Sequence, residues 1–200
     1  MKAAGLRGRE RLLAVARRLL EKGGPRAVTV QGIAAGAHVS APSLYKHFAG
    51  RSQVVRALQV EEWEAFRRAL APSLRASSPL ARLRKCGRLY IQFGLDRPHA
   101  YRLLFLSDEA AHPAVGGEHE QSPGLDMLVE LVEACQRSGA LPRRANPEDL
   151  ALAFWATCHG LVALYLQGGG EARFVRTRYL VLSRRALEAM TRQAGEKRRV

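Results

Sequence analysis

The residues whose types and spacing suggest a chemical role lie between positions 29 and 51. Their side chains are of the kinds that can contact nucleotide bases. A glutamine such as Gln31 can form two hydrogen bonds with adenine, and a lysine such as Lys46 can bond guanine. Ala41 and Pro42 are apolar groups that can touch the methyl group of thymine. The residues expected to point outward are Gln31, Ser40, Ala41, Pro42, Ser43, Tyr45, Lys46 and His47.

Two short helices, at about 29–36 and 40–46, must position these side chains. Thr29 is a good N-cap because its hydroxyl can accept a hydrogen bond from a backbone N–H of the first turn, and Ser40 repeats the arrangement. The apolar residues that could pack between the helices are Ile33, Ala34, Ala37, Val39, Leu44 and Phe48. Two short helices joined by a tight turn, with small, polar and basic residues outside, predict a helix-turn-helix whose second helix enters the major groove of DNA.

The charge of the chain favours a polyanion as its partner. The net charge is +14 and the sequence pI is about 10.8. Residues 1–51 hold 10 Lys and Arg against 2 Asp and Glu, whereas residues 52–200 hold 22 against 16. A general bias toward arginine would also raise the charge, but it would do so evenly. The excess is densest around the predicted helix-turn-helix, so we favour double-stranded DNA.

The cysteines and the apolar runs indicate a cytoplasmic protein with no membrane segment. Cys86, Cys135 and Cys158 form no C-x-x-C pair and no disulfide framework, which fits a reducing compartment. The basic N-terminus lacks the apolar centre of a signal peptide. The longest apolar run, residues 150–166, is shorter than a typical membrane span of about 20 residues, so we expect a buried helix there.

Apolar periodicity and proline signals predict an all-α fold of about nine helices. After a loose basic arm at 1–8, the expected helices are 9–22, 29–36, 40–46, 51–70, 79–95, 98–108, 123–138, 147–167 and 171–192. Ser78, Ser122 and Asn146 each precede a proline and are expected N-caps. Residues 110–121, rich in Gly, Pro and polar side chains, are expected to form a mobile loop.

The first quarter of the chain resembles the TetR-type bacterial transcriptional regulators. The resemblance rests on E-K-G-G at 21–24, T-V-x-x-I-A at 29–34, V-S-A-P-S-L-Y-K-H-F at 39–48 and the basic Arg51. It implies an N-terminal three-helix DNA-binding domain at 1–50, followed by a larger helical domain at 51–200 for effector binding and dimerisation. That family usually has glycine where His38 stands, in a position that favours a left-handed backbone, so we expect a slightly strained or altered turn.

The resemblance also implies roles for individual residues. It places Thr29, Tyr45, His47 and Arg51 on phosphates, although the family usually has lysine where Arg51 stands. The residues expected to face base edges are Gln31, Ala41, Pro42, Ser43 and Lys46, with Ser40 beside them. The alternative is that Tyr45 and His47 only cap the small core and that Lys46 is solvated.

The later part of the chain carries a second resemblance. The stretch Trp155 to Gly160 is similar to the W-x-x-x-H-G signature of one class of TetR-type C-terminal domains. His159 could be a satisfied core histidine or the polar anchor of an apolar ligand pocket. The candidate ligand-binding residues are Tyr90, Phe93, Tyr101, Phe105, Met127, Trp155, Cys158 and His159. No spacing of His and Cys predicts a metal site, and no cofactor is expected.

The sequence therefore predicts a transcriptional regulator. We expect a repressor that a small, largely apolar effector releases from a palindromic operator, acting as a homodimer through the helices near 147–167 and 171–192. An activator and a nonspecific architectural DNA binder are alternatives. An all-α enzyme is less favoured, because no acid–base pair, phosphate loop or nucleophile motif is found.

Overall fold

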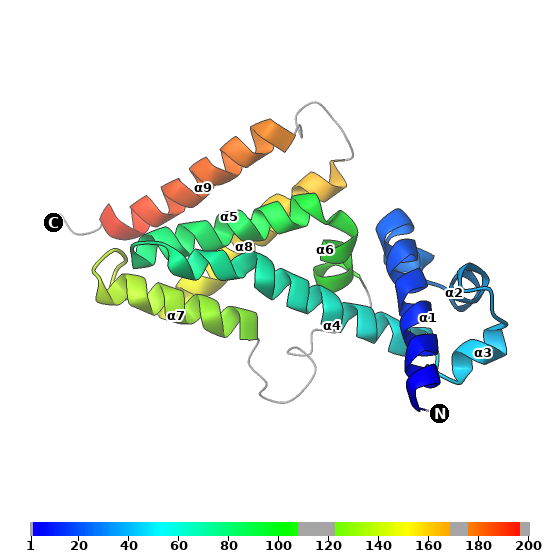
Figure 1. The fold of residues 1–200 in the computed structure, drawn as a ribbon. Helices are drawn as coiled ribbons and strands as arrows, with labels where there is room; N and C mark the ends of the chain where they lie inside the picture. The colour runs from blue at the N-terminus through cyan, green and yellow to red at the C-terminus, as the bar shows by residue number, and fades with distance from the viewer. Residues whose placement is uncertain (1, 108–122, 169–175, 197–200) are drawn as a thin grey trace. The chain divides into compact units, whose positions relative to one another are not determined.

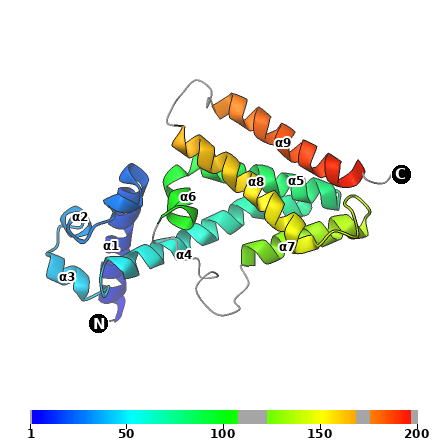
Figure 2. The same cartoon turned by 180° about the vertical axis from the view of Figure 1, so that it is seen from behind.

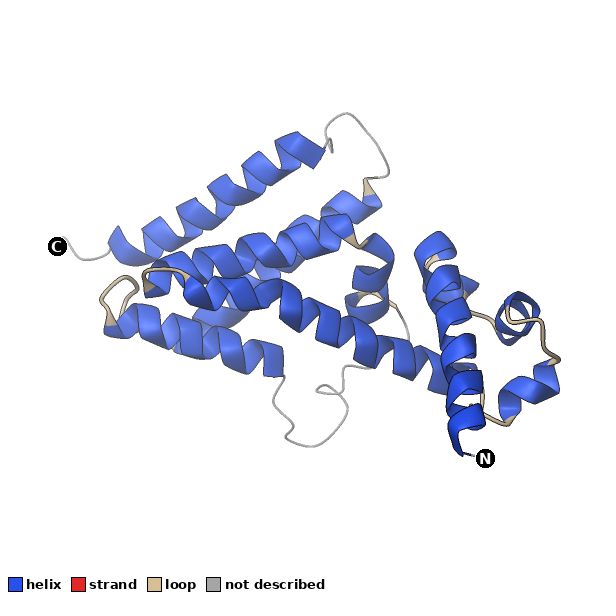
Figure 3. Cartoon of the chain, viewed as in Figure 1, coloured by secondary structure: helices blue, strands red, loops and turns tan. Residues whose placement is uncertain are grey.

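The computed structural model describes residues 2–107, 123–168 and 176–196. These residues form nine α-helices and two short 3-10 helices, with no strand among them (Figure 3). The all-α prediction is confirmed. The expected loop at 110–121, the cap at Ser122 and the start of the last predicted helix at 171–175 lie outside the described residues.

The helix bounds follow the order of Figure 1. The α-helices are α1 (Lys2–Gly23), α2 (Val30–Gly36), α3 (Ala41–Tyr45), α4 (Arg51–Leu70), α5 (Pro79–Asp96), α6 (Pro98–Phe105), α7 (Pro123–Arg137), α8 (Pro147–Gln167) and α9 (Arg176–Glu196). The 3-10 helices are η1 (Pro25–Ala27) and η2 (Ala71–Arg75). Two of the expected caps form, because Ser78 accepts a hydrogen bond from the N–H of Ala81 and Asn146 accepts one from Glu148.

Two expectations about helix ends were wrong. The predicted basic arm at 1–8 is helical from Lys2, because the alanines and leucine there favour a helix enough to carry two glycines. The helix predicted at 98–108 ends at Phe105, after which Leu106 leaves helical geometry. Both 3-10 helices were missed, since a single turn leaves no periodic pattern in a sequence.

The chain divides into two compact units. The first unit takes Met1–Ala65 together with Arg97–His112, and the second takes Phe66–Asp96 together with Pro113–Val200. Helix α4 therefore begins in the first unit and ends in the second, and α6 belongs to the first. The predicted division of function at residue 50 stays a prediction.

The first unit is built on one apolar cluster that joins α1, α2, α3, α4 and α6. Its members are Leu12, Leu13, Val15, Ala16, Leu20, Val28, Ile33, Ala37, Leu44, Phe48, Val54, Val55, Leu58 and Leu103. Helix α2 lies very close to α1, since a Cβ added at Gly36 would lie 2.6 Å from Cγ1 of Val15. Full burial of each leucine or isoleucine in such a cluster stabilises the fold by about 1.5–3 kcal/mol.

Two arginine–glutamate pairs link helices of the first unit. Arg17 on α1 pairs with Glu61 on α4, at 2.6 Å between Nε and Oε2. Arg97, at the N-cap of α6, pairs with Glu62 on α4 at 2.9 Å. The first pair is partly exposed, whereas the Glu62 side chain is 9% exposed. Burial raises the pKa of Glu62 in spite of the attraction to Arg97.

The second unit is a helical bundle centred on α5 and α8. Helix α5 packs against α7, α8 and α9, and α8 in turn packs against α7 and α9 (Figures 1 and 2). Gly87 allows this packing, because a Cβ added there would lie 2.8 Å from Phe154 on α8 and 3.0 Å from Leu187 on α9. Arg176 fastens the start of α9 to the end of α5, where it pairs with Asp96 and donates to the carbonyl of Leu95.

Helix α8 is less buried than expected. Its inner face holds Ala151, Phe154, Cys158 and Val162. Only 22% of the most apolar 18-residue stretch of the helix is buried within the chain. The expectation of a buried helix was therefore wrong, because the helix is apolar on both faces and only one of them packs. Among the described residues α8 is the one helix long and apolar enough to cross a membrane. A mostly buried core helix of a soluble protein can also meet these criteria of length and composition.

Candidate functional sites

The N-terminus of α2 has the geometry that the sequence predicts. Thr29 is the N-cap in extended conformation, and its Oγ1 accepts a hydrogen bond of 3.0 Å from the N–H of Gly32. The cap satisfies one of the backbone donors that a helix start leaves without a partner. The inner face of α2 then buries Ile33 and Ala34, so Gln31 is left on the exposed side.

The turn after α2 is a Schellman motif with His38 in its left-handed position. His38 has a φ of 53°, the only positive φ of a non-glycine residue in the described part of the chain. The N–H of Val39 bonds the carbonyl of Ala34 at 3.0 Å, and the N–H of His38 bonds that of Ala35 at 3.1 Å. These are the two hydrogen bonds of the motif. The predicted left-handed turn is confirmed, and it carries the cost of a side chain at that φ.

The second helix of the motif, α3, is short and exposed on its outer side. Ser40 occupies the N-cap position, but the expectation that it repeats the cap of Thr29 was wrong, because its side chain accepts no hydrogen bond from the helix. Leu44 is buried in the cluster of the first unit, whereas Tyr45 is 56% exposed. Of the residues predicted to bind DNA, those that are exposed are Gln31, Ser40, Pro42, Tyr45 and Lys46, and those that are partly buried are Thr29, Ala41, Ser43, His47 and Arg51.

Helix α1 packs against the residues that directly follow α3. A Cβ added at Gly8 would lie 2.8 Å from Nε2 of His47, so the imidazole lies directly on the backbone of α1. The guanidinium of Arg9 lies 4.9 Å from the centre of the buried Phe48 ring, in a cation–π contact. The spacing of α3 from α1 thus depends on a glycine, and nothing in the periodicity of α1 indicated it.

Arg51 has a structural role that sequence reasoning missed. Its Nε donates to the carbonyl of Val28 at 2.7 Å, and one terminal nitrogen donates to the carbonyl of Pro25 at 2.9 Å. Arg51 is the first residue of α4, and Val28 directly precedes the N-cap of α2. The guanidinium therefore fastens the start of α4 to the start of α2. Its predicted contact with phosphate stays a prediction.

The candidate ligand-binding residues fall into two groups. Tyr101 and Phe105 lie in the first unit, where Phe105 meets Trp63 edge to face at 5.1 Å between ring centroids. The other candidates lie in the second unit and are Tyr90, Phe93, Met127, Trp155, Cys158 and His159. Met127, on α7, is partly buried, and no contact joins it to the others among the interactions described.

Three of these residues form a hydrogen-bonded chain between α5 and α8. Nε1 of Trp155 donates to the hydroxyl of Tyr90 at 3.1 Å, and the same hydroxyl lies 3.2 Å from Nδ1 of His159. Phe66 meets both Tyr90 and Phe93 edge to face, at 5.5 and 5.1 Å. Burial lowers the pKa of His159, which favours the neutral imidazole. The structure thus joins the tryptophan and the histidine of the W-x-x-x-H-G stretch through one phenol.

The cysteines of the second unit are poor nucleophiles. All three are buried, and burial raises the pKa of Cys86 and of Cys135 to about 11. It also raises the pKa of Cys158. A thiol that keeps its proton at neutral pH neither attacks a substrate nor binds a metal well. Among the described residues, no cluster of three or more His, Cys, Asp and Glu could hold a metal ion.

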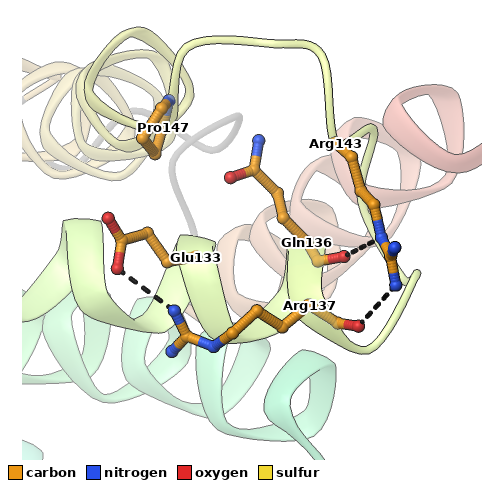
Figure 4. Close-up of a pocket in the computed structure, with 5 residues that line it drawn as sticks. All are labelled: Glu133, Gln136, Arg137, Arg143 and Pro147. Atoms are coloured by element: carbon orange, nitrogen blue, oxygen red, sulfur yellow. Dashed lines mark hydrogen bonds and ion pairs between the residues drawn. The ribbon is translucent and has the colours of Figure 1, made fainter.

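A surface hollow of about 360 Å³ lies where α7 ends, lined by Glu133, Gln136, Arg137, Arg143 and Pro147 (Figure 4). Its polar groups hold the loop between α7 and α8. Arg143 donates to the backbone carbonyls of Gln136 and Arg137, at 3.2 and 3.0 Å. The Gln136 amide donates to the carbonyls of Pro142 and Ala145. We therefore assign the hollow a structural role.

Two family models match the chain. One, described as bacterial regulatory proteins, tetR family, matches residues 12–58. The other, described as tetracyclin repressor-like, C-terminal domain, matches residues 83–190, which is more than half of the 200 residues. A search of curated proteins gives no match.

Several solved structures share the fold over nearly their whole length. A protein of unknown function from Rhodococcus sp. RHA1 is 24% identical with a TM-score of 0.76, over 94% of this chain and 96% of that chain. A TetR-family transcriptional regulator from Pectobacterium atrosepticum is 22% identical with a TM-score of 0.69, over 98% of both chains. The ketosteroid transcriptional regulator KstR2 of Mycobacterium tuberculosis is 18% identical with a TM-score of 0.59, over 94% of this chain and 95% of that chain.

Proposed function

The chain belongs to the TetR family of bacterial regulatory proteins, and from that premise we propose that it is a repressor which binds a palindromic operator and leaves it when a small, largely apolar effector binds. The family supports a DNA-binding regulator and a regulatory role in place of a catalytic one. Repression, the effector and the cytoplasmic location are parts of the proposal.

The observation that carries the proposal is the outer face of α2 and α3. Its polar and basic side chains are accessible, while the apolar side chains of the same helices fill the core of the first unit. A capped α2 and a hydrogen-bonded turn hold α3 in one orientation. A preorganised surface of this kind suits direct reading of base edges by Gln31 and Lys46, with Tyr45 and His47 on phosphates.

A single helix-turn-helix makes few contacts with DNA, so we expect tight operator binding from a homodimer. The outer face of α8 supports a second copy as its cover, because Leu152 and Leu164 are 51% and 56% exposed. Between them lies Gly160, where an added Cβ would meet no atom of the chain within 4 Å. Val181 and Leu182 on α9 are also exposed. Two copies joined through α8 and α9 would present two recognition helices to a palindrome.

Effector release would follow from a two-state dimer. An effector that binds better to the state whose recognition helices are misplaced for successive major grooves shifts the population away from the operator. We assign effector binding to the larger helical part of the chain, where Tyr90, Phe93 and Trp155 supply aromatic surface and His159 a polar group. Tyr101, Phe105, Met127 and Cys158 remain further candidates.

The test measures binding of the full-length protein to the DNA upstream of its own gene, with random duplex as competitor and with salt varied. We expect protection of a palindrome and preference over random duplex by at least about 10³-fold. Equal affinity for any duplex, with a steep salt dependence, would show an architectural binder instead. Absence of binding at low salt would refute both.

Two single changes make the test specific. We expect Lys46→Ala to weaken operator binding by about 1–3 kcal/mol and random-duplex binding much less, because the proposed contact is to a base. Arg144→Ala is the matched control, since Arg144 is an exposed cation in the second unit. A loss with Arg144→Ala equal to that with Lys46→Ala would show that overall charge, and not the helix-turn-helix, drives binding.

A further inference from the structure

We propose that the N-terminal half of α1 is part of the DNA-binding surface, with Arg9 as an additional phosphate-binding residue beside His47 and with Gly8 as the residue that positions the His47 imidazole. The inference rests on the proposed function, because it takes the DNA partner from there. It adds a third helix to the two of the helix-turn-helix, and a cation that lies outside that motif.

Arg9 lies on the inward face of α1, where an arginine that only meets solvent is not expected. Positions 9, 13, 16 and 20 follow one helical stripe, at spacings of four, three and four residues. Leu13, Ala16 and Leu20 of this stripe are buried in the apolar cluster of the first unit. Arg9 continues the stripe but is exposed, so it lies where the core of the first unit ends.

Phe48 orients the Arg9 guanidinium at this place. The guanidinium carbon lies 4.9 Å from the centre of the Phe48 ring, and Phe48 is 1% exposed. The ring attracts the positive charge, so the contact leaves the N–H groups of the guanidinium available to an acceptor. Among the residues that the structure describes, no carboxylate forms an ion pair with Arg9. The arginine is therefore oriented and ready for an anion from outside the chain.

His47 brings its proposed phosphate contact to the same place. A Cβ added at Gly8 would lie 2.8 Å from Nε2 and 3.0 Å from Cε1 of His47, so the imidazole lies against α1 one residue away from Arg9. Both views of the chain show the start of α1 beside the segment that joins α3 to α4 (Figures 1 and 2). An arginine and a histidine this close together suit neighbouring phosphates of one DNA strand.

Removal of the Arg9 charge should reduce the salt dependence of DNA binding. Arg9→Met keeps an apolar side chain on Phe48 but cannot bind phosphate. In the full-length protein we expect it to weaken binding to the operator and to random duplex by the same factor, about tenfold or more, because a phosphate carries no sequence information. The slope of log affinity against log salt concentration should fall by about 0.9 for each protomer, and by twice that amount for a dimer.

Two further variants separate a phosphate contact from an effect of overall charge. Arg18→Met is the matched control, because Arg18 is an exposed arginine that helix geometry places on the opposite side of α1, and it should change the slope less than half as much. Arg9→Lys keeps a charge that can bind phosphate and should retain most of the slope. Equal changes for the two methionine variants would overturn the inference. So would an Arg9→Lys variant with the slope of Arg9→Met.

Gly8→Ala tests the positioning of His47 through a double-mutant cycle. Alanine favours a helix more than glycine does, so α1 should stay folded, whereas the new Cβ must displace the imidazole. We expect Gly8→Ala to lower operator affinity by about fivefold in the original protein, and to cause no further loss in a protein that already carries His47→Ala. Urea unfolding should show Gly8→Ala to be at least as stable as the original protein. An equal loss of affinity in both backgrounds, no loss in either, or a lowered stability contradicts the positioning role.

The inference and the proposed function fail in different ways. If the original protein does not bind the operator, the proposed function is refuted and the inference with it. If the original protein binds its operator specifically, while Arg9→Met leaves both the affinity and the salt slope unchanged, the inference alone is refuted.

Discussion

His38 shows how one side chain can be retained at a position that suits glycine. Its φ of 53° is forced by the two hydrogen bonds of the turn after α2. A side chain with a Cβ pays a steric cost there, which glycine avoids. The turn orients α3. The backbone strain at His38 is therefore part of what places this helix.

Replacing His38 with glycine should stabilise the protein. We expect His38→Gly to raise the free energy of unfolding by about 0.5–1 kcal/mol, measured by urea denaturation, because the left-handed conformation is then free of strain. His38→Val is the control and should destabilise, since a β-branched residue tolerates a positive φ least. A valine variant as stable as the original protein would argue against strain in the turn.

His159 should make stability depend on pH in a defined direction. Its folded-state pKa is lowered below the ordinary value of 6.5, so between the two values the unfolded chain binds a proton that the folded protein refuses. The stabilising contribution is therefore present above pH 6.5 and is lost as the pH falls through the folded pKa. The slope should be a fraction of the limit of about 1.4 kcal/mol per pH unit, because the half-buried ring is screened by solvent.

The comparison that checks this pH effect is the difference in unfolding free energy between the original protein and His159→Asn, followed from pH 8 to pH 5. The asparagine cannot titrate, so the difference isolates the histidine from the carboxylates. A difference that grows in favour of the original protein at acidic pH would contradict the lowered pKa.

At the scale of helices, the two arginine–glutamate pairs offer a test of burial. Glu61 and Glu62 are neighbours on α4, yet the side chain of Glu61 is 37% exposed and that of Glu62 is 9% exposed. Arg97 is the cation that compensates the buried carboxylate, and it belongs to the start of α6. The position of α6 in the first unit thus depends partly on this pair and partly on Leu103 in the apolar cluster.

We expect Arg97→Met to destabilise the protein by about 2–3 kcal/mol, because it leaves the Glu62 carboxylate buried without its cation. The double variant Glu62→Leu with Arg97→Met should recover most of that loss. Arg17→Met is the matched control, and as an exposed pair it should cost less than about 1 kcal/mol. Thermal or urea unfolding measures all three. Equal losses for the two single variants would show that burial does not distinguish the pairs.

The helices with strong boundary signals could be predicted from the sequence. Helices α4 and α8 have the predicted bounds because Pro72, Asn146 and Pro147 punctuate the apolar pattern. The outer face of the helix-turn-helix was also predictable, since periodicity fixes which side chains of α2 and α3 point outward. The cap by Thr29 was predictable as well, because a threonine directly before a helical pattern favours an N-cap.

The remaining features depend on contacts between distant residues. The hydrogen bonds of Arg51 to Val28 and Pro25 join positions more than twenty residues apart, and no local pattern reports them. The link between Tyr90 and His159 spans 69 positions. The W-x-x-x-H-G stretch indicated that its tryptophan and histidine matter, but only the packing of α5 on α8 identifies the phenol between them.

At the scale of the whole molecule, we propose that the outer face of α8 decides the oligomeric state. We expect Leu152→Glu with Leu164→Glu to convert the dimer into a monomer, because two buried charges would face each other across the proposed interface. Val60→Glu is the matched control, since Val60 on α4 is 64% exposed and lies outside that face. Sedimentation equilibrium measures the mass. A double variant that sediments as a dimer would place the interface elsewhere.

The exposed apolar face of α8 also affects how many copies of this regulator a cell must produce. If the operator recognises only the dimer, the number of active molecules at concentrations below the dimer dissociation constant rises with the square of the number of chains, so halving the supply removes about three quarters of them. Control of the target gene would then change abruptly over a narrow range of expression. The strength of the contact across Leu152, Gly160 and Leu164 would set the copy number at which the gene turns off.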